Sequence, residues 1–120
     1  MIFALATPVA QSALGVFRIS GSGCCQVFGG ALNKPITKHR MVFLRDVVWN
    51  GVMVDRCSIV FYEAPHSCTG EDSVEVFCHG GLSVIKSFTN MFLEMGFVEA
   101  GPGEFTKIAF ENGKMSLNEA

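Results

Sequence analysis

The dipeptide Asn50-Gly51, set between two runs of β-forming residues, is the feature that most constrains how this chain can fold. A tight type I′ turn needs positive φ angles at both central residues, and because Asn and Gly tolerate these best, the pair favours a two-residue hairpin. The flanking runs, residues 41–49 and 52–62, are rich in Val, Phe and other strand-forming residues. We therefore predict two antiparallel strands joined by this turn.

Apolar periodicity places the remaining elements. Residues 15–20 alternate as in a strand, with Phe17 and Ile19 on one side and Arg18 on the other. Residues 82–95 carry apolar side chains at helical spacing and predict the main helix. The other expected elements are strands at 2–6, 74–78 and 97–100, a weak helix capped by Ser22 and running toward Leu32, and a short helix at 105–112.

Composition limits the classes of protein to which the chain can belong. Its 120 residues, 49% hydrophobic and 17% charged, fit one domain over positions 1–120, and the apolar excess predicts some surface covered by another chain or by further parts of the same protein. The net charge of −2 gives no footprint of a nucleic-acid-binding surface, and the basic cluster at 34–40 is interpreted as a solvated loop. Five cysteines without disulfide spacing, no secretory signal and no membrane-length apolar run predict a cytoplasmic protein.

The C-terminal residues resemble the start of a new helix. Ser116 and Glu119 have the spacing of a capping box, with Ser116 at the N-cap. A natural terminus rarely falls one turn into a capped helix, so we expect a longer protein in which a helical domain begins at about 116–120. The pair Gly113-Lys114 is followed by Met115 and lacks the upstream glycine, so this sequence does not contain the phosphate-binding loop of GTPases.

Three charged residues are candidates for binding a ligand. Glu75 lies mid-strand between Val74 and Val76, where a carboxylate is costly unless donors reach it, so either the face is solvated or Glu75 binds something. A pterin or guanine ring suits a carboxylate because its ring N–H and exocyclic amine are parallel donors. Arg18 could complement an anionic ligand but is also typical of a surface strand. Lys114 follows a helix end, where a surface lysine is common.

The segment His79-Gly80-Gly81 joins a strand to a helix and predicts an anion or carbonyl site at the helix N-terminus. A nucleophilic pair formed by Cys78 and His79 is disfavoured, because neighbouring strand side chains point to opposite faces. A zinc site built from Cys57, Cys68, Cys78 and His79 is also disfavoured, because the usual paired spacing is missing.

Six segments, in consistent order and spacing, together resemble the N-terminal domain of the tRNA modification GTPases known as TrmE or MnmE. They cover essentially the whole chain: Ile2-Phe-Ala-Leu-Ala-Thr-Pro8, Phe17-Arg-Ile-Ser-Gly21, Ser67-Cys-Thr-Gly-Glu-Asp72, Glu75 through His79-Gly-Gly81, Pro102-Gly-Glu-Phe-Thr106 and Ala109-Phe-Glu-Asn-Gly-Lys114. The resemblance implies an α+β fold with a mixed sheet and two or three helices, related to the fold of aminomethyltransferases. It also implies a homodimer whose folate sites lie at the subunit boundary.

The resemblance further implies a function. The domain would hold a tetrahydrofolate one-carbon donor, of the 5-formyltetrahydrofolate type, for transfer to the wobble uridine of certain tRNAs. An FAD-dependent partner completes the modification complex, while GTP, Mg²⁺ and K⁺ belong to a GTPase domain that this sequence lacks, so we do not expect the chain to be catalytic alone. The family's folate-contacting residues fall on Arg18, Glu75 and Lys114. Supporting positions are Thr69, Glu71, His79, Gly80 and Gly81.

Three positions depart from the family pattern. The segment Val9-Ala-Gln-Ser-Ala-Leu14 has no glycine, and Cys68 replaces an aromatic residue. Both changes favour an alternative, a structural dimerisation domain of the same GTPase that does not bind folate. Ser116 stands where Asp is usual and keeps the N-cap role. A free-standing one-carbon transferase is a third alternative, which the unfinished C-terminal helix disfavours.

Overall fold

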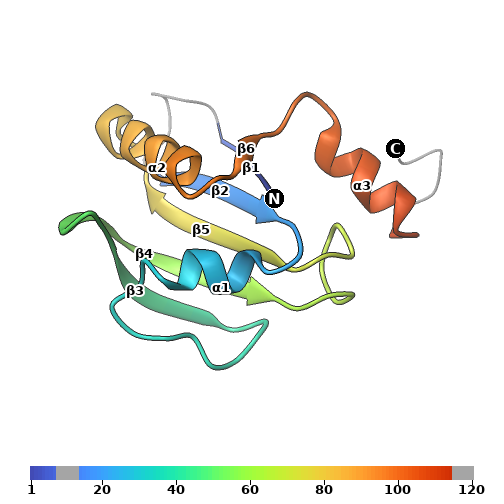
Figure 1. The fold of residues 1–120 in the computed structure, drawn as a ribbon, viewed down its shortest axis with the longest axis horizontal. Coiled ribbons are helices and arrows are strands. Elements are labelled where there is room, and N and C mark those ends of the chain that lie inside the picture. The colour runs from blue at the N-terminus through green and yellow to red at the C-terminus, as the bar shows by residue number, and fades with distance from the viewer. Residues whose placement is uncertain (8–13, 115–120) are drawn as a thin grey trace.

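The computed structural model describes residues 1–7 and 14–114, within which six strands form one sheet in the order β3-β4-β5-β2-β1-β6 (Figure 1). Among these strands, β1 and β6 pair in parallel and every other pair is antiparallel, so the sheet is mixed. The strands are β1 Ile2–Leu5, β2 Leu14–Ser20, β3 Val42–Trp49, β4 Val52–Tyr62, β5 Ser73–His79 and β6 Val98–Glu99.

The described residues also form three helices, α1 Cys24–Gly29, α2 Leu82–Glu94 and α3 Glu104–Glu111. The predicted α+β class, with a mixed sheet and two or three helices, is therefore confirmed. The last predicted strand is shorter than residues 97–100, since β6 has two residues. No helix in this part of the chain is both long and apolar enough to cross a membrane. The glycine-poor positions 9–13 and the capping box at Ser116 and Glu119 lie outside the described residues.

The β3–β4 hairpin has the predicted two-residue turn. Trp49 pairs with Val52, and the turn residues Asn50 and Gly51 have φ angles of 53° and 76°, as a type I′ turn requires. The hairpin end is attached to the last turn of α2. The Trp49 indole Nε1 donates a hydrogen bond to Glu94 Oε2 at 2.5 Å, and Asn50 Nδ2 donates to the same oxygen at 3.1 Å.

The core lies between the sheet and the helices α1 and α2, which cover the same face in Figure 1. Phe92 of α2 is fully buried at the centre of this core. Five phenylalanine rings surround it, with centroids between 5.1 and 5.9 Å from its own: Phe3, Phe17, Phe28, Phe88 and Phe97. Aromatic rings from α1, α2, β1 and β2 therefore all pack against Phe92. Because Phe92 belongs to α2, this helix is the main element that covers the core.

The prediction that Ser22 caps α1 is wrong. The N-cap residue is Gly23, in a left-handed conformation with φ 81°, and no side chain of α1 itself caps the helix. The Asp72 carboxylate instead accepts the Gly23 N–H at 3.1 Å and the Ala64 N–H at 2.9 Å. These two backbone donors hold the pKa of the Asp72 carboxyl below its usual value. Asp72 thereby connects the start of α1 to the 63–72 loop, a contact between residues far apart in sequence.

Candidate functional site

The sheet face opposite α1 and α2 carries two charged residues side by side. The strand registers place Val60, Glu75, Arg18 and Ala4 in one row across β4, β5, β2 and β1. Because side chains alternate along a strand and Phe17 is buried in the core, Arg18 and its cross-strand partner Glu75 point away from the core. The predicted orientation of Arg18 is therefore confirmed.

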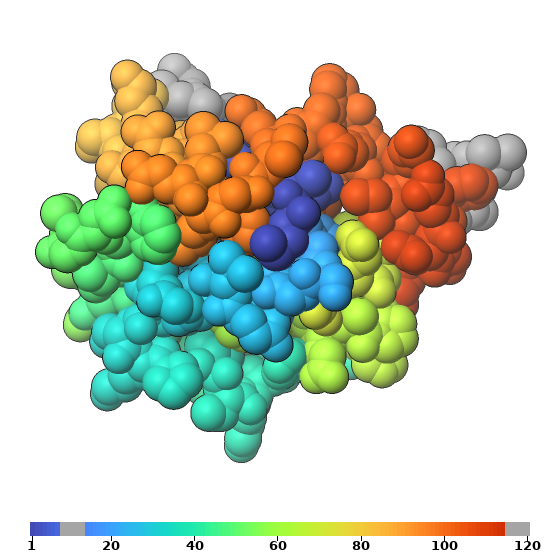
Figure 2. All heavy atoms as spheres, viewed as in Figure 1, coloured from blue at the N-terminus to red at the C-terminus, as the bar shows by residue number. Residues whose placement is uncertain are grey.

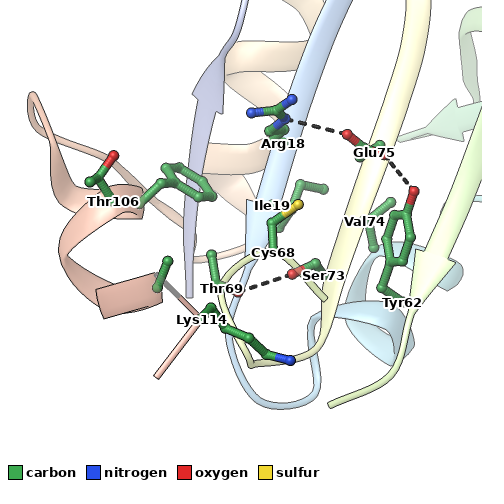
Figure 3. Close-up of a pocket in the computed structure, with 12 residues that line it drawn as sticks. Arg18, Ile19, Tyr62, Cys68, Thr69, Ser73, Val74, Glu75, Thr106 and Lys114 are labelled. Atoms are coloured by element: carbon green, nitrogen blue, oxygen red, sulfur yellow. Dashed lines mark hydrogen bonds and ion pairs between the residues drawn. The ribbon is translucent and has the colours of Figure 1, made fainter. Parts of the chain in front are cut away.

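The Glu75 carboxylate is covered and hydrogen-bonded on both oxygens (Figure 3). Its Oε2 accepts from Arg18 Nε at 3.3 Å, and its Oε1 accepts from the Tyr62 hydroxyl at 2.7 Å. The Glu75 side chain is 20% exposed, whereas that of Arg18 is 53% exposed. The bond to Glu75 raises the pKa of Tyr62 to about 12, because ionising the phenol would place a second negative charge beside the carboxylate. Glu75 is thus held in place by two donors and does not lie on a freely solvated face.

A cavity of about 380 Å³ opens beside this group and is bounded by β2, β5, the 63–72 loop and α3 with the residues that follow it. Arg18, Glu75 and Lys114, the three positions singled out from the sequence, all line it (Figure 3). The other lining residues are Ile19, Tyr62, Cys68, Thr69, Ser73, Val74, Phe105, Thr106 and Ala109. The cavity therefore has apolar walls and a few polar groups, as small-molecule sites usually do.

Thr69 is a supporting position that the structure brings to the cavity. It is buried, and its Oγ1 lies 2.8 Å from Ser20 Oγ and 3.2 Å from Ser73 Oγ. Glu71 does not line the cavity, but its Oε1 accepts a hydrogen bond from Ser20 Oγ at 3.1 Å. These contacts tie the 63–72 loop to the ends of β2 and β5, and so fix one wall of the cavity.

The end of α3 is held against the same loop. Asn112 Nδ2 donates to the Thr69 carbonyl at 2.9 Å. Gly70 has φ 84°, and a Cβ at this position would lie 2.7 Å from Asn112 Cβ, so a larger residue would push the helix end away. In Figure 2 the yellow-green atoms of the loop meet the red atoms of α3. This contact sets the position of Lys114, two residues after Asn112.

The structure does not bring the segment His79-Gly80-Gly81 to the cavity. His79 pairs with Leu14 at the opposite end of the β2–β5 pair from Ser20 and Ser73. Its backbone N–H donates to Asp55 Oδ2 at 2.9 Å, and its Nδ1 lies 2.8 Å from Asp55 Oδ1. This segment therefore joins the end of β5 to the start of α2, and Asp55 holds it against β4.

The cavity also contains residues that sequence reasoning missed. Tyr62, Ser73, Phe105 and Thr106 line it, yet none is predicted as a ligand-binding residue, although Phe105 and Thr106 lie in one of the six family segments. The hairpin signal fixes how β3 pairs with β4, but the register of β4 on β5, which brings Tyr62 to Glu75, joins segments with no short turn between them. The alternation of side chains along β4 could have indicated Tyr62, because it places Tyr62 on the same face as Val60, which pairs with Glu75.

Comparisons with known proteins agree with this architecture. Residues 1–114 match the family model described as GTP-binding protein TrmE N-terminus. The chain is 42% identical over 124 residues to the tRNA modification GTPase MnmE of Thermotoga maritima, and 39% identical over 120 residues to that of Malacoplasma penetrans. Both alignments cover 99% of this chain and 27% of the relative, so the chain spans about a quarter of the length of these relatives. The chain therefore belongs to the family of TrmE N-terminal domains.

Proposed function

We propose that this chain binds a tetrahydrofolate one-carbon donor of the 5-formyltetrahydrofolate type in the cavity beside Glu75, and that it forms a homodimer. It does so as the N-terminal domain of a GTPase that modifies the wobble uridine of tRNA. The observation that carries the proposal is the Glu75 carboxylate, which lines the cavity and is held by Arg18 and Tyr62.

The carboxylate keeps acceptor capacity for a ligand. An ionised carboxylate has about four lone-pair positions on its two oxygens. Tyr62 and Arg18 occupy one position on each oxygen, so one position on each remains. A reduced pterin presents a ring N–H and an amine N–H in parallel, which match two such acceptors. The fixed orientation of Glu75 therefore suits the edge of a pterin ring.

Arg18 and Lys114 supply positive charge for the anionic parts of folate. Within the described residues, the terminal guanidinium nitrogens of Arg18 make no hydrogen bond and Lys114 makes no ion pair. We assign these groups to carbonyl or carboxylate oxygens of the ligand. When bound, tetrahydrofolate supplies the one-carbon unit, while the residues of this chain bind and orient it.

Dimerisation is supported by apolar side chains on the sheet face that α1 and α2 leave uncovered. Val42 and Leu44 of β3 are 67% and 58% exposed. Val42 pairs with Val60, which in turn pairs with Glu75, so Val42 lies on the same face as Glu75. Leu44, paired with Ser58 two residues further along β3, lies on this face as well. A second copy would bury this surface. The FAD-dependent partner, tRNA, GTP and metal ions are assigned to the complete cytoplasmic enzyme, because this chain spans 27% of the relatives' length.

Calorimetric titration with 5-formyltetrahydrofolate tests the proposal. We expect saturable binding of one ligand per subunit, together with a dimeric mass in sedimentation. A dimer that gives no binding heat and no change in fluorescence with the ligand would support the alternative, a structural dimerisation domain without folate binding. A monomer that binds the ligand would contradict the proposed homodimer but not the proposed folate binding.

Thiol labelling with a mass-spectrometric readout tests where the ligand binds. Cys68 is exposed and lines the cavity, whereas the other four cysteines are buried, and burial raises the pKa of Cys57 and Cys78 to about 12 and about 11. Iodoacetamide must reach the sulfur, so we expect it to modify the exposed Cys68 first. Saturating 5-formyltetrahydrofolate should slow this reaction at least about fivefold by covering the thiol. Unchanged labelling at saturation would place the ligand elsewhere.

A further inference from the structure

A second cavity, also of about 380 Å³, adjoins the folate cavity. Its walls include Tyr62, Cys68 and Lys114, which also line the first cavity, so the two are contiguous. The residues that belong to the second cavity alone are Arg40, His66 and Ser67. Its lining contains no carboxylate, in contrast to the Glu75 side of the folate cavity.

The second cavity is cationic although the chain as a whole carries a net charge of −2. In the described parts of the chain, Arg40 and Lys114 form no ion pair. The nearby Glu63 carboxylate lies 3.7 Å from His39 Nδ1, and neither residue lines the cavity. The positive charge is therefore available to a ligand.

Arg40 is held at this position by its backbone. Its φ angle is 63°, in the left-handed region that a non-glycine residue adopts at a cost. Its N–H donates to the Phe61 carbonyl at 2.8 Å, which places Arg40 beside the end of β4 and next to Tyr62. The side chain therefore starts from a fixed point in the wall of the second cavity.

We propose that this second cavity binds the carboxylates of a γ-linked polyglutamate tail, and hence that the substrate class is polyglutamylated tetrahydrofolate. The inference rests on the proposed folate site. With the pterin at Glu75, the glutamate end of the same ligand can continue past Lys114, which lies in the shared wall, toward Arg40 and His66. Each added γ-glutamyl unit contributes one further carboxylate, which an arginine or lysine can bind.

The geometry favours this ligand over the phosphates of an RNA. A nucleic-acid surface that binds by its phosphates presents a broad basic patch or stripe. Here the cationic groups line one shallow depression that adjoins the folate cavity, and the chain has a net charge of −2. A flexible tail that is covalently attached to the pterin reaches such a cavity without a separate binding event.

The test compares the monoglutamate and the pentaglutamate of 5-formyltetrahydrofolate by calorimetry at low salt. We expect the unmodified chain to bind the pentaglutamate about tenfold more tightly, from an ion pair with Arg40 and a hydrogen bond donated by His66. The double variant Arg40→Gln/His66→Gln should bind the two forms equally and keep the monoglutamate affinity. Lys38→Gln is the matched control, because it removes a charge from the same loop at a residue that lines neither cavity, and it should keep the preference.

Two results would overturn the inference while leaving the folate site intact: equal affinities for the two forms in the unmodified chain, or an undiminished preference in the double variant. Failure of both forms to bind would overturn the proposed function itself, and the inference with it. Titration with an anticodon stem-loop RNA tests the other class of ligand, an RNA bound by its phosphates. If the double variant loses RNA affinity but keeps the pentaglutamate preference, the cavity binds phosphate and the inference is wrong.

Discussion

Replacement of Glu75 by Gln is expected to weaken 5-formyltetrahydrofolate binding about a hundredfold, or about 2.8 kcal/mol. Gln has nearly the same shape and can still accept the Tyr62 hydroxyl bond, but one of its two acceptors becomes an N–H₂ donor. That donor would face a pterin N–H, so the ligand would lose one bond and leave a donor unpaired. Calorimetric titration of the variant measures the loss.

The control for this substitution is Glu99→Gln, which removes the same charge from an exposed residue of β6 that does not line the cavity. It should leave folate affinity unchanged. Thermal unfolding followed by circular dichroism checks that Glu75→Gln remains folded. A folded Glu75→Gln variant that binds folate as tightly as the unmodified chain would remove Glu75 from the site.

Truncation of Phe92 to Ala is expected to lower the free energy of unfolding by about 4 kcal/mol. The side chain is fully buried, and the rings of five phenylalanines surround it, so the truncation leaves a cavity that several elements must collapse to fill. Urea denaturation, followed by the fluorescence of the single tryptophan Trp49, measures the change.

Phe110→Ala is the matched control, because Phe110 of α3 is 40% exposed and does not belong to the core cluster. Its expected cost is below about 1 kcal/mol. Phe92→Leu should fall between the two, since it keeps much of the buried volume. Similar losses for Phe92→Ala and Phe110→Ala would mean that the aromatic cluster is not the centre of stability.

Local sequence patterns were sufficient to predict most elements of the fold. The turn at Asn50-Gly51 and the helix at 82–95 were found because each depends on residues within a few positions of one another. The same rule explains one error. The local position of Ser22 predicts a helix cap, whereas the contact at this helix start comes from Asp72, about fifty residues away.

The candidate site was only partly visible in the sequence. Glu75 was a carboxylate at a costly position and Arg18 a lone charge, and each taken alone also suited an ordinary surface. The family resemblance groups them with Lys114, while no pattern in the sequence indicates that Tyr62 or Arg40 binds a ligand. The same resemblance suggested the segment 79–81, which the structure places at the other end of β5.

Tertiary structure decided which charges meet. Arg18 and Glu75 are 57 positions apart in sequence and become neighbours through the β2–β5 register. Lys114 lines the same cavity because Asn112 packs on Gly70. Turns and helices follow from the conformational preferences of neighbouring residues. Strand register and helix placement follow from the packing of distant side chains around Phe92 and the 63–72 loop, and that packing forms the cavity.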